Sequence, residues 1–251
     1  MPMADRFAAI SDVHGNRWAL EAVLSDIASL GIGAVVNLGD SLWGPLDPAG
    51  TAELLMALDP PSVRGNEDRI VVAPDAGREG TATWRFVRSA LEPRHLEWLR
   101  RQEITALAAD GRALLFHGTP RRDDEYLLET VGPAGAAPRP AAEVDAIIGA
   151  SAQELVLCGH SHVPRTVRLP GGRLAVNCGS VGLQAYDDDA PYFHVMENGT
   201  PHARYAVLER APTGWTAVHR SVDYDWPAAA AAAERNGRPD WAVWLRTGRA
   251  V

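Results

Sequence analysis

The sequence predicts an α/β (α+β) fold in which two mixed β-sheets pack as a sandwich and helices flank them. In the first half of the chain, short apolar strands alternate with amphipathic helices, an order that builds parallel sheets through right-handed crossovers. In the second half, turn residues separate β-type runs, which is typical of antiparallel hairpins. A chain of 251 residues suits one large domain, and we predict a single domain over residues 1–251.

Three strands and two helices are expected in the N-terminal part. The runs RFAAIS (6–11) and GAVVNLGD (33–40) are short and apolar with polar ends, as buried strands are. Between them, apolar residues recur at helical spacing up to Gly31, which is a natural C-cap. The stretch PAGTAELLMALDP is predicted to be a helix closed by Pro60 and Pro61, and SVRGN a third short strand.

The second half is predicted to contain mostly hairpins between two helical regions. A helix is expected over residues 81–101, interrupted at Pro93, and one or two further helices from about residue 226. The Pro-, Ala- and Gly-rich stretch 131–143 is predicted to be a surface loop. Three hairpins are expected where turn dipeptides separate β-type runs, at Asp110-Gly111, Gly171-Gly172 and Asn198-Gly199.

Composition and charge exclude several classes of function. The net charge is −8 and no basic tract is present, which argues against a general nucleic-acid binder. No apolar run reaches the roughly 18 residues of a membrane span, and no signal peptide is recognised, so we expect a cytoplasmic protein without a membrane partner. The C-terminal tryptophans Trp226, Trp241 and Trp244 fit either a core or a dimer face, which leaves a homo-oligomer open.

Polar side chains follow five predicted strands, in the stretches SDVHGN, LGD, RGNED, FHG and CGHSH. Ligands in open α/β sheets bind at the carboxyl ends of strands, so these side chains are expected to converge at one edge of the core. In the Asp-x-His and His-x-His pairs, residues two apart in an extended segment point the same way. The candidate metal ligands are Asp12, His14, Asp40, Asn66, His117, His160 and His162.

Three oxygen ligands and four imidazoles form a donor set that suits Mn, Fe, Zn or Ni better than Ca or Mg. Seven ligands are too many for one tetrahedral ion, but they fit two divalent ions that share a bridging carboxylate. Each motif alone has a plainer interpretation as a strand-end cap or a surface pair. The series of glycine-flanked polar residues at successive strand ends is what favours a centre with two transition metal ions.

In this order, D-x-H-G-N, G-D, G-N, H-G and G-H-S-H resemble the calcineurin-like metallophosphoesterase superfamily, and VNCGSVG resembles a segment of its small bacterial and archaeal phosphodiesterases. The resemblance implies a β-sandwich flanked by helices and in-line attack of a metal-bridging hydroxide on a small or nucleotide-like phosphodiester. It also implies a first metal site of Asp12, His14 and His162, a second of Asn66, His117 and His160, and Asp40 as the bridge.

Two alternatives remain open at this point. The same metal core serves phosphomonoesterases and protein phosphatases, and the motifs do not separate these reactions from diester hydrolysis. Some relatives use the fold as a protein-interaction scaffold after losing ligands. Here all seven ligand positions are filled, which disfavours the scaffold.

Glu67 stands where the family commonly has a catalytic His, directly after the predicted tight turn at Gly65-Asn66. A Glu donates a proton only if its pKa is raised, and an ionised Glu repels an anionic substrate unless it is paired. The hypothesis is that Glu67 makes the enzyme depend on good leaving groups. Two further candidates have a plainer interpretation: Asn16 as a helix cap rather than a phosphate contact, and Arg64 as a salt-bridge partner rather than a phosphoryl contact.

Aromatic and acidic residues near the motifs have two interpretations as well. Trp43 lies just past the Gly-Asp motif and is either a wall for a base or aryl group or a packing residue. Tyr126, Tyr186 and the acidic run Asp187–Asp189 are either the rim of the site or solvated surface.

Overall fold

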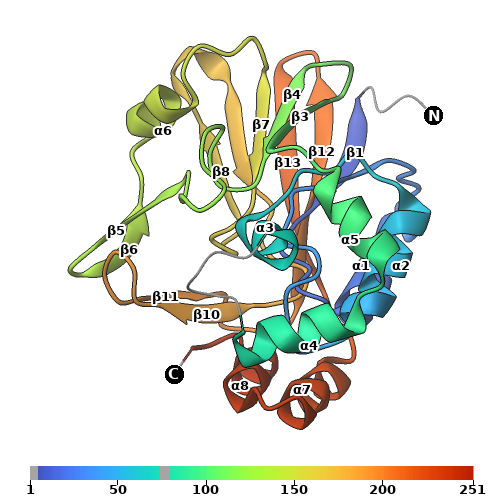
Figure 1. Ribbon diagram of the computed structural model, residues 1–251. Helices are drawn as coiled ribbons and strands as arrows, with labels where there is room; N and C mark the ends of the chain where they lie inside the picture. Colours follow the sequence, from blue (N-terminus) through green and yellow to red (C-terminus); the bar gives the residue numbers. More distant parts are fainter. Residues whose placement is uncertain (1–4, 74–79, 251) are drawn as a thin grey trace.

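Two mixed β-sheets form the centre of the computed structural model, which describes residues 5–73 and 80–250 (Figure 1). The first sheet contains β1 (Arg6–Ile10), β2 (Val35–Asn37), β12 (Ala203–Ala211) and β13 (Gly214–Val222), in the order β13-β12-β1-β2. The second contains β3 (Thr105–Ala108), β4 (Ala113–Phe116), β7 (Leu155–Cys158), β8 (Arg165–Arg168) and β9 (Leu174–Asn177), in the order β3-β4-β7-β9-β8. Two ribbons pair β5 (Glu129–Gly132) with β6 (Gly135–Pro138), and β10 (Ala185–Asp188) with β11 (His194–Glu197).

Strand β1 shows why the central strands are apolar throughout. Phe7 and Ala9 face the second sheet and join the core between the two sheets. Ala8 and Ile10 point to the opposite face and join the core beneath the helices. Because successive side chains of a strand alternate between faces, a strand covered on both sides needs an unbroken apolar run. Strand β1 pairs in parallel with β2 and antiparallel with β12, so the sheet is mixed.

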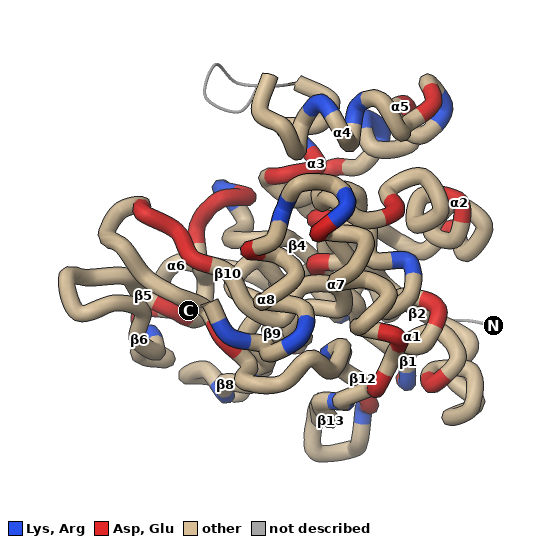
Figure 2. The backbone as a smooth tube through the Cα atoms, turned by 90° about the horizontal axis from the view of Figure 1, so that it is seen from below, with Lys and Arg blue, Asp and Glu red and all other residues tan. Residues whose placement is uncertain are grey.

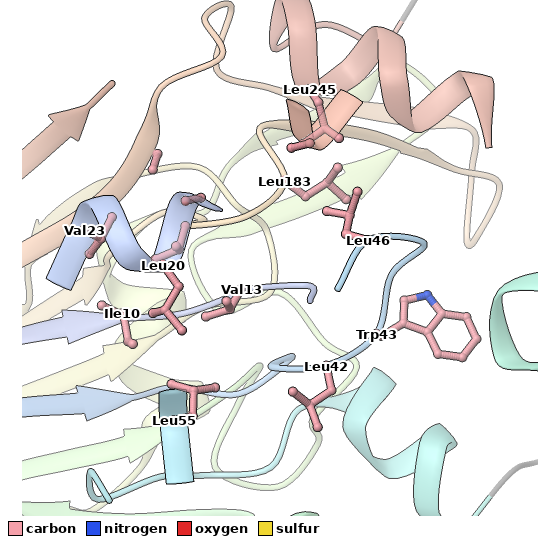
Figure 3. Close-up of a cluster of buried hydrophobic side chains, with 14 of the residues drawn as sticks. Ile10, Val13, Leu20, Val23, Leu42, Trp43, Leu46, Leu55, Leu183 and Leu245 are labelled. Carbon is pink, nitrogen blue, oxygen red and sulfur yellow. The ribbon is translucent and has the colours of Figure 1, made fainter. Parts of the chain in front are cut away.

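Helices cover the outer faces of both sheets. The core against the first sheet contains residues from α1 (Arg17–Ser29), α2 (Pro48–Leu58), α3 (Asn66–Val72), α4 (Ala82–Ala90), α5 (Pro93–Arg100), α7 (Trp226–Arg235) and α8 (Pro239–Thr247). On the other side, α6 (Ala141–Ile148) packs Val144 and Ile148 against the second sheet, near a short 3₁₀ turn, η1 (Pro170–Gly172). Figure 3 shows part of the first core, with Leu245 of α8 near Leu183 and Leu46.

The predicted fold class is confirmed: the sheets are mixed, they pack through a shared apolar core, and helices flank them. Two predicted hairpins are also confirmed, since β3 pairs antiparallel with β4 across Asp110-Gly111 and β8 with β9 across Gly171-Gly172. The helical stretch breaks before Pro93, as predicted. Trp241 and Trp244 are buried in the core, which was one of their two interpretations.

Three predictions about local structure are wrong. The stretch 131–143 is not a loop, because it contains most of the β5–β6 ribbon and the start of α6. No hairpin forms at Asn198-Gly199: β11 pairs with β10, whereas β12 pairs with β1 and β13. The third strand is reduced to isolated bridges at Ser62 and Val63, because α3 begins at Asn66.

Within the described ranges, none of the helices combines the length and the apolar character required to cross a membrane.

Candidate metal centre

The structure brings the seven predicted ligands to one edge of the sandwich, in loops that leave the carboxyl ends of strands. Asp12 and His14 follow β1, and Asp40 follows β2. His117 follows β4, and the remaining ligands are Asn66 at the start of α3 and His160 and His162 after β7. All are buried except Asn66 and His160, which are half-buried.

The backbone geometry of these loops differs from the extended geometry that the sequence suggested. Five of the ligands have positive φ angles, namely Asp12 (54°), His14 (52°), Asp40 (51°), His160 (69°) and His162 (60°). Non-glycine residues adopt this left-handed region rarely and at a cost in free energy, and such residues gather at functional sites. The predicted convergence is therefore observed, but its cause is a set of strained turns rather than the alternation of an extended chain.

Asp12, His14 and His162 form the first cluster. The Nε2 atoms of His14 and His162 lie 3.1 Å apart, and Asp12 Oδ1 lies 3.2 Å from His162 Nε2. The Nδ1 atoms bond to backbone carbonyls, that of His14 to Trp43 at 2.9 Å and that of His162 to Leu183 at 2.7 Å. A carbonyl oxygen only accepts, so each Nδ1 carries a proton, and in the neutral ring the Nε2 lone pair faces the cluster.

Asp40, His117 and His160 form the second cluster. The distance between His117 Nε2 and Asp40 Oδ2 is 3.1 Å, and His117 Nδ1 donates to the carbonyl oxygen of Leu38 at 2.7 Å. The two clusters are neighbours, since His117 Nε2 also lies 3.8 Å from Asp12 Oδ1. As in the first cluster, a backbone carbonyl fixes an imidazole ring through its Nδ1 atom. Metal-binding histidines are commonly oriented by such a second hydrogen bond.

Several atoms of these residues are buried without a hydrogen-bond partner among the described residues. They are Asp12 Oδ1, Asn66 Oδ1 and His117 Nε2. Buried polar atoms are almost always paired because an unpaired one costs free energy, so each such exception requires an explanation. A divalent cation accepts lone pairs from all three, and mixed nitrogen and oxygen donors suit borderline transition metals. The residues present thus fit the predicted metal ions.

The carboxylates of the centre are held in their charged form. Burial by itself raises the pKa of Asp12, but the neighbouring His162 and His117 bring that pKa below its ordinary value. The same competition holds the pKa of Asp40 well below its usual range, with His117 as the largest favourable contribution. Both groups therefore carry a negative charge at neutral pH, as metal ligation requires.

The histidine pKa values diverge according to their neighbours. Burial lowers the pKa of His14, but the Glu67 carboxylate more than offsets this and raises the pKa to about 9. Burial likewise opposes charge on His117, whereas Asp40 raises its pKa to about 10. Burial and the nearby His117 lower the pKa of His160 to about 4, which keeps that ring neutral. Such large opposed shifts within one cluster are typical of functional sites.

Glu67 lies directly at the centre. Its Oε2 is 3.3 Å from His14 Nδ1, and its backbone amide donates to Asp40 Oδ1 at 2.9 Å. Its carboxylate also forms a third group with His14 and Asp40, in which all ligand atoms lie within 4.8 Å of one another. The sequence assigned Glu67 to the place of a catalytic His and not to the ligands, and the structure adds this direct contact with a ligand ring.

The glycine before Asn66 has a packing role rather than the predicted role in a tight turn. Gly65 has an ordinary backbone conformation, with φ −83° and ψ 170°. A Cβ atom at this position would lie 2.0 Å from Asp40 Oδ1, so only glycine lets the two loops approach this closely.

Asp68 is a supporting residue that the sequence analysis missed. Its buried carboxylate accepts hydrogen bonds from the backbone amides of Ser41 (3.0 Å), Leu42 (3.3 Å) and Gly65 (3.4 Å). It thereby ties the loop that carries Asp40 to the one that carries Asn66. Burial, together with the charge of Asp40, raises its pKa to about 7. The sequence does contain a signal for this role. Asp68 lies three positions after the N-cap residue Gly65 and just before an apolar run, which is the position of the acidic residue in a capping box.

Asn16 caps a helix, which is the plainer of its two interpretations. Its Oδ1 accepts from the Ala19 amide at 3.1 Å, and its Nδ2 donates to the Gly182 carbonyl at 2.8 Å and the Tyr224 hydroxyl at 3.2 Å. The side chain is fully buried and its polar atoms are occupied, so the structure gives it no free group for substrate. Arg64 has a buried Nε without a hydrogen-bond partner among the described residues, and it is not among the residues that line the pocket.

A pocket of about 480 Å³ opens over the metal centre. Trp43, Tyr126 and Tyr186 line it, as one interpretation of each predicts. Trp43 is also buried in the core beneath the helices, so both of its interpretations are confirmed. The Tyr126 ring lies 4.7 Å from that of His160, and the Tyr186 ring lies 4.6 Å from that of His162. The two tyrosine hydroxyls are 2.7 Å apart. The tyrosines therefore contact the ligand rings directly.

Known proteins are similar to this chain in sequence and in fold. A sequence model of the calcineurin-like phosphoesterase superfamily domain matches residues 6–199. An uncharacterized protein of Methanocaldococcus jannaschii is 27% identical over 248 residues, which cover 93% of this chain and 94% of that protein. A metallophosphoesterase from Sphaerobacter thermophilus gives a TM-score of 0.75 at 26% identity, with 98% of this chain and 100% of that chain covered.

The structure of a hypothetical protein from Pyrococcus horikoshii gives a TM-score of 0.74 at 19% identity, with 98% of this chain and 99% of that chain covered. This likeness bears on the fold alone. The matched sequence region contains all seven candidate ligands and ends before α7 and α8. This chain belongs to the calcineurin-like phosphoesterase superfamily.

Proposed function

We propose that this protein is a dinuclear metal-dependent phosphoesterase that hydrolyses phosphodiester bonds. The supporting observation is the pair of adjacent clusters, in which Asp12 Oδ1 and His117 Nε2 are buried without a hydrogen-bond partner among the described residues. Divalent ions such as Mn, Fe, Zn or Ni, when bound there, supply Lewis-acid activation of water and of the phosphoryl group. The residues that would hold them are Asp12, His14 and His162 for one ion, Asn66, His117 and His160 for the other, and Asp40 for both.

The chain's own residues orient these ligands. The carbonyl oxygens of Trp43, Leu183 and Leu38 fix three imidazole rings through Nδ1, which leaves each Nε2 directed at the centre. Asp40 belongs to one group with His117 and to another with His14, a position that suits a carboxylate shared between two ions. The site is thus oriented before any substrate enters.

The charge of the pocket favours a diester over a monoester. Arg238 is the single arginine among the described residues that line it, and Asp240 accepts two hydrogen bonds from its Nε, at 2.9 and 3.1 Å. A diester carries one negative charge fewer than a fully ionised monoester, so it needs less cationic compensation. A cavity of about 480 Å³ also suits a small or nucleotide-like ester better than a phosphorylated protein segment.

A panel of p-nitrophenyl esters tests this proposal, with the protein reconstituted separately with Mn, Fe, Zn and Ni. We expect bis(p-nitrophenyl) phosphate to be hydrolysed with a higher kcat/KM than p-nitrophenyl phosphate, and chelation to abolish both reactions. A preference for the monoester would instead support the phosphomonoesterase or protein phosphatase alternative. Less than one bound transition metal ion per chain under metal-replete conditions would support a non-catalytic scaffold.

A further inference from the structure

An exposed aromatic side chain stands at the mouth of the pocket. Phe193 is 64% exposed and lines the pocket, in the connection between β10 and β11. Covering an apolar ring that is exposed to water is favourable, so a ligand that packs on Phe193 binds more tightly. Its neighbour Tyr192 is also exposed, at 48%, but it does not line the pocket. Because only Phe193 lines the pocket, Tyr192 serves as a matched control for the effect of removing an exposed aromatic ring.

A second wall comes from α8, which lies beyond the region matched by the family and beside β10 (Figure 1). Trp241 and Trp244 of this helix line the pocket, with ring centroids 6.2 Å apart. The Trp241 ring packs edge-on against His14 at 5.7 Å, so this wall adjoins the metal centre. Arg238 lies over the Trp241 ring and donates to Thr83 of α4 at 2.7 Å, which fixes the helix in place.

The rim of the pocket is acidic. Asp187, Asp188 and Asp189 line the pocket, and Figure 2 shows acidic residues gathered where β10 lies. Among the residues that the structure describes, none of the three carboxylates forms an ion pair. The aromatic part of the pocket therefore carries uncompensated negative charge, which opposes any anionic group placed there.

We propose that the pocket selects phosphodiesters with a single phosphoryl group whose organic substituent is aromatic and bears no negative charge. The substituent contacts Phe193 and the α8 wall, while the phosphoryl group lies at the candidate metal centre. This proposal rests on the proposed phosphodiesterase function and adds the substrate class to it. The aromatic walls recognise the ring, and the acidic rim excludes oligophosphates and other polyanions.

The first experiment holds the leaving group constant and varies only the other substituent. We compare kcat/KM for phenyl p-nitrophenyl phosphate with that for methyl p-nitrophenyl phosphate, and we expect the phenyl ester to be favoured about 10-fold. In Phe193→Ala this ratio should fall to about 2-fold, because the ring that covers the substituent is gone. Tyr192→Ala is the matched control, and its ratio should stay at the wild-type value.

The second experiment adds charge without changing the reacting ester. Thymidine 5′-(p-nitrophenyl phosphate) is compared with the same compound phosphorylated at its 3′-hydroxyl. We expect the extra phosphate to lower kcat/KM at least 10-fold, and the double variant Asp187→Asn, Asp189→Asn to recover about 3-fold of that loss. Asp223→Asn, an exposed carboxylate that does not line the pocket, should recover nothing.

The outcomes separate this proposal from the function on which it rests. If the diesters are hydrolysed but the phenyl and methyl esters react equally, or if Phe193→Ala and Tyr192→Ala lower the ratio alike, the substrate class is wrong and the phosphodiesterase stands. If the 3′-phosphorylated thymidine ester is hydrolysed with the same kcat/KM as the unphosphorylated one, the acidic rim does not exclude polyanions. If no diester is hydrolysed with any of the four metals, the phosphodiesterase itself fails, and this proposal fails with it.

Discussion

The Nε2 atoms of His14 and His162 face each other at 3.1 Å, although the Nδ1 of each ring already bonds to a backbone carbonyl. Two lone pairs at this distance repel each other unless a proton or a cation lies between them. The carboxylate of Asp12 lies beside them, with Oδ1 3.2 Å from His162 Nε2 and without a hydrogen-bond partner among the described residues. This relationship favours a positive charge, a proton or a bound cation, at the first cluster.

Replacing one of these rings should remove one metal ion. In His162→Ala the first cluster loses a nitrogen ligand, whereas the second cluster, Asp40, His117 and His160, keeps all of its ligands. We expect the bound transition metal to fall by about one ion per chain, and diester hydrolysis to fall about 100-fold or more. Metal analysis of the purified, metal-replete variant by mass spectrometry gives the first quantity directly.

His219→Ala is the control for this loss, because His219 lies on β13 with its Nε2 2.9 Å from Thr166 Oγ1, outside the centre. Its metal content should equal that of the wild type. An unchanged metal content in His162→Ala would contradict the assignment of the first cluster.

Asp68→Asn should weaken metal binding without removing a ligand. The carboxamide keeps the shape of the side chain, and its oxygen still accepts from the Ser41 and Leu42 amides at the place of Oδ1. Its NH₂ group, at the place of Oδ2, cannot accept the hydrogen bond that the Gly65 amide donates, so the tie between the two loops is lost. We expect metal affinity to fall about 10- to 100-fold, the usual cost of losing a residue that orients ligands. Competition with a fluorescent chelator measures the affinity. Wild-type affinity in this variant would show that the loops of Asp40 and Asn66 hold their positions without it.

Glu67→His tests what the carboxylate does to leaving-group dependence. The wild-type carboxylate contacts His14 at 3.3 Å, and an ionised carboxylate cannot protonate a departing alkoxide. We expect the variant to gain about 10-fold on an alkyl diester relative to an aryl diester, since the aryl oxide leaves without a proton. Steady-state kinetics on both esters give the ratio. A variant without a selective gain on the alkyl ester contradicts the hypothesis.

A surface network that joins α1 to the first sheet should make stability depend on pH. Asp26 accepts hydrogen bonds from Tyr205 at 2.6 Å and Arg220 at 2.9 Å, and these partners hold its pKa below the ordinary value. A carboxylate with a lowered pKa in the folded state stabilises the protein above its unfolded pKa, and this stabilisation is lost as pH falls. Asp26→Asn should therefore cost about 1 kcal/mol at neutral pH and progressively less in acid.

Urea unfolding of wild type and Asp26→Asn, at neutral pH and below the ordinary pKa of an aspartate, measures this difference. A free-energy difference that is the same at both pH values would show that the charge of Asp26 contributes nothing.

Local chemistry made much of this protein predictable. The turn at Asp110-Gly111 and the break before Pro93 follow from the backbone preferences of those residues, so each could be assigned without knowing its neighbours in space. The convergence of Asp12, Asp40 and His117 followed from a general rule on the carboxyl ends of strands. The turns that achieve it, with positive φ at Asp12 and Asp40, were not predictable because tertiary contacts hold them.

Non-local pairing decided the rest. The chain around Asn198-Gly199 carries a local hairpin signal, yet β12 pairs with β1, which lies at the far end of the sequence. Asp68 acquires its role only where two loops meet. The sequence by itself determined which residues can bind metal ions, because ligand chemistry belongs to the side chain. Only the tertiary structure brought Phe193 and Trp241 to the lining of one pocket, because packing between distant segments decides which surfaces meet.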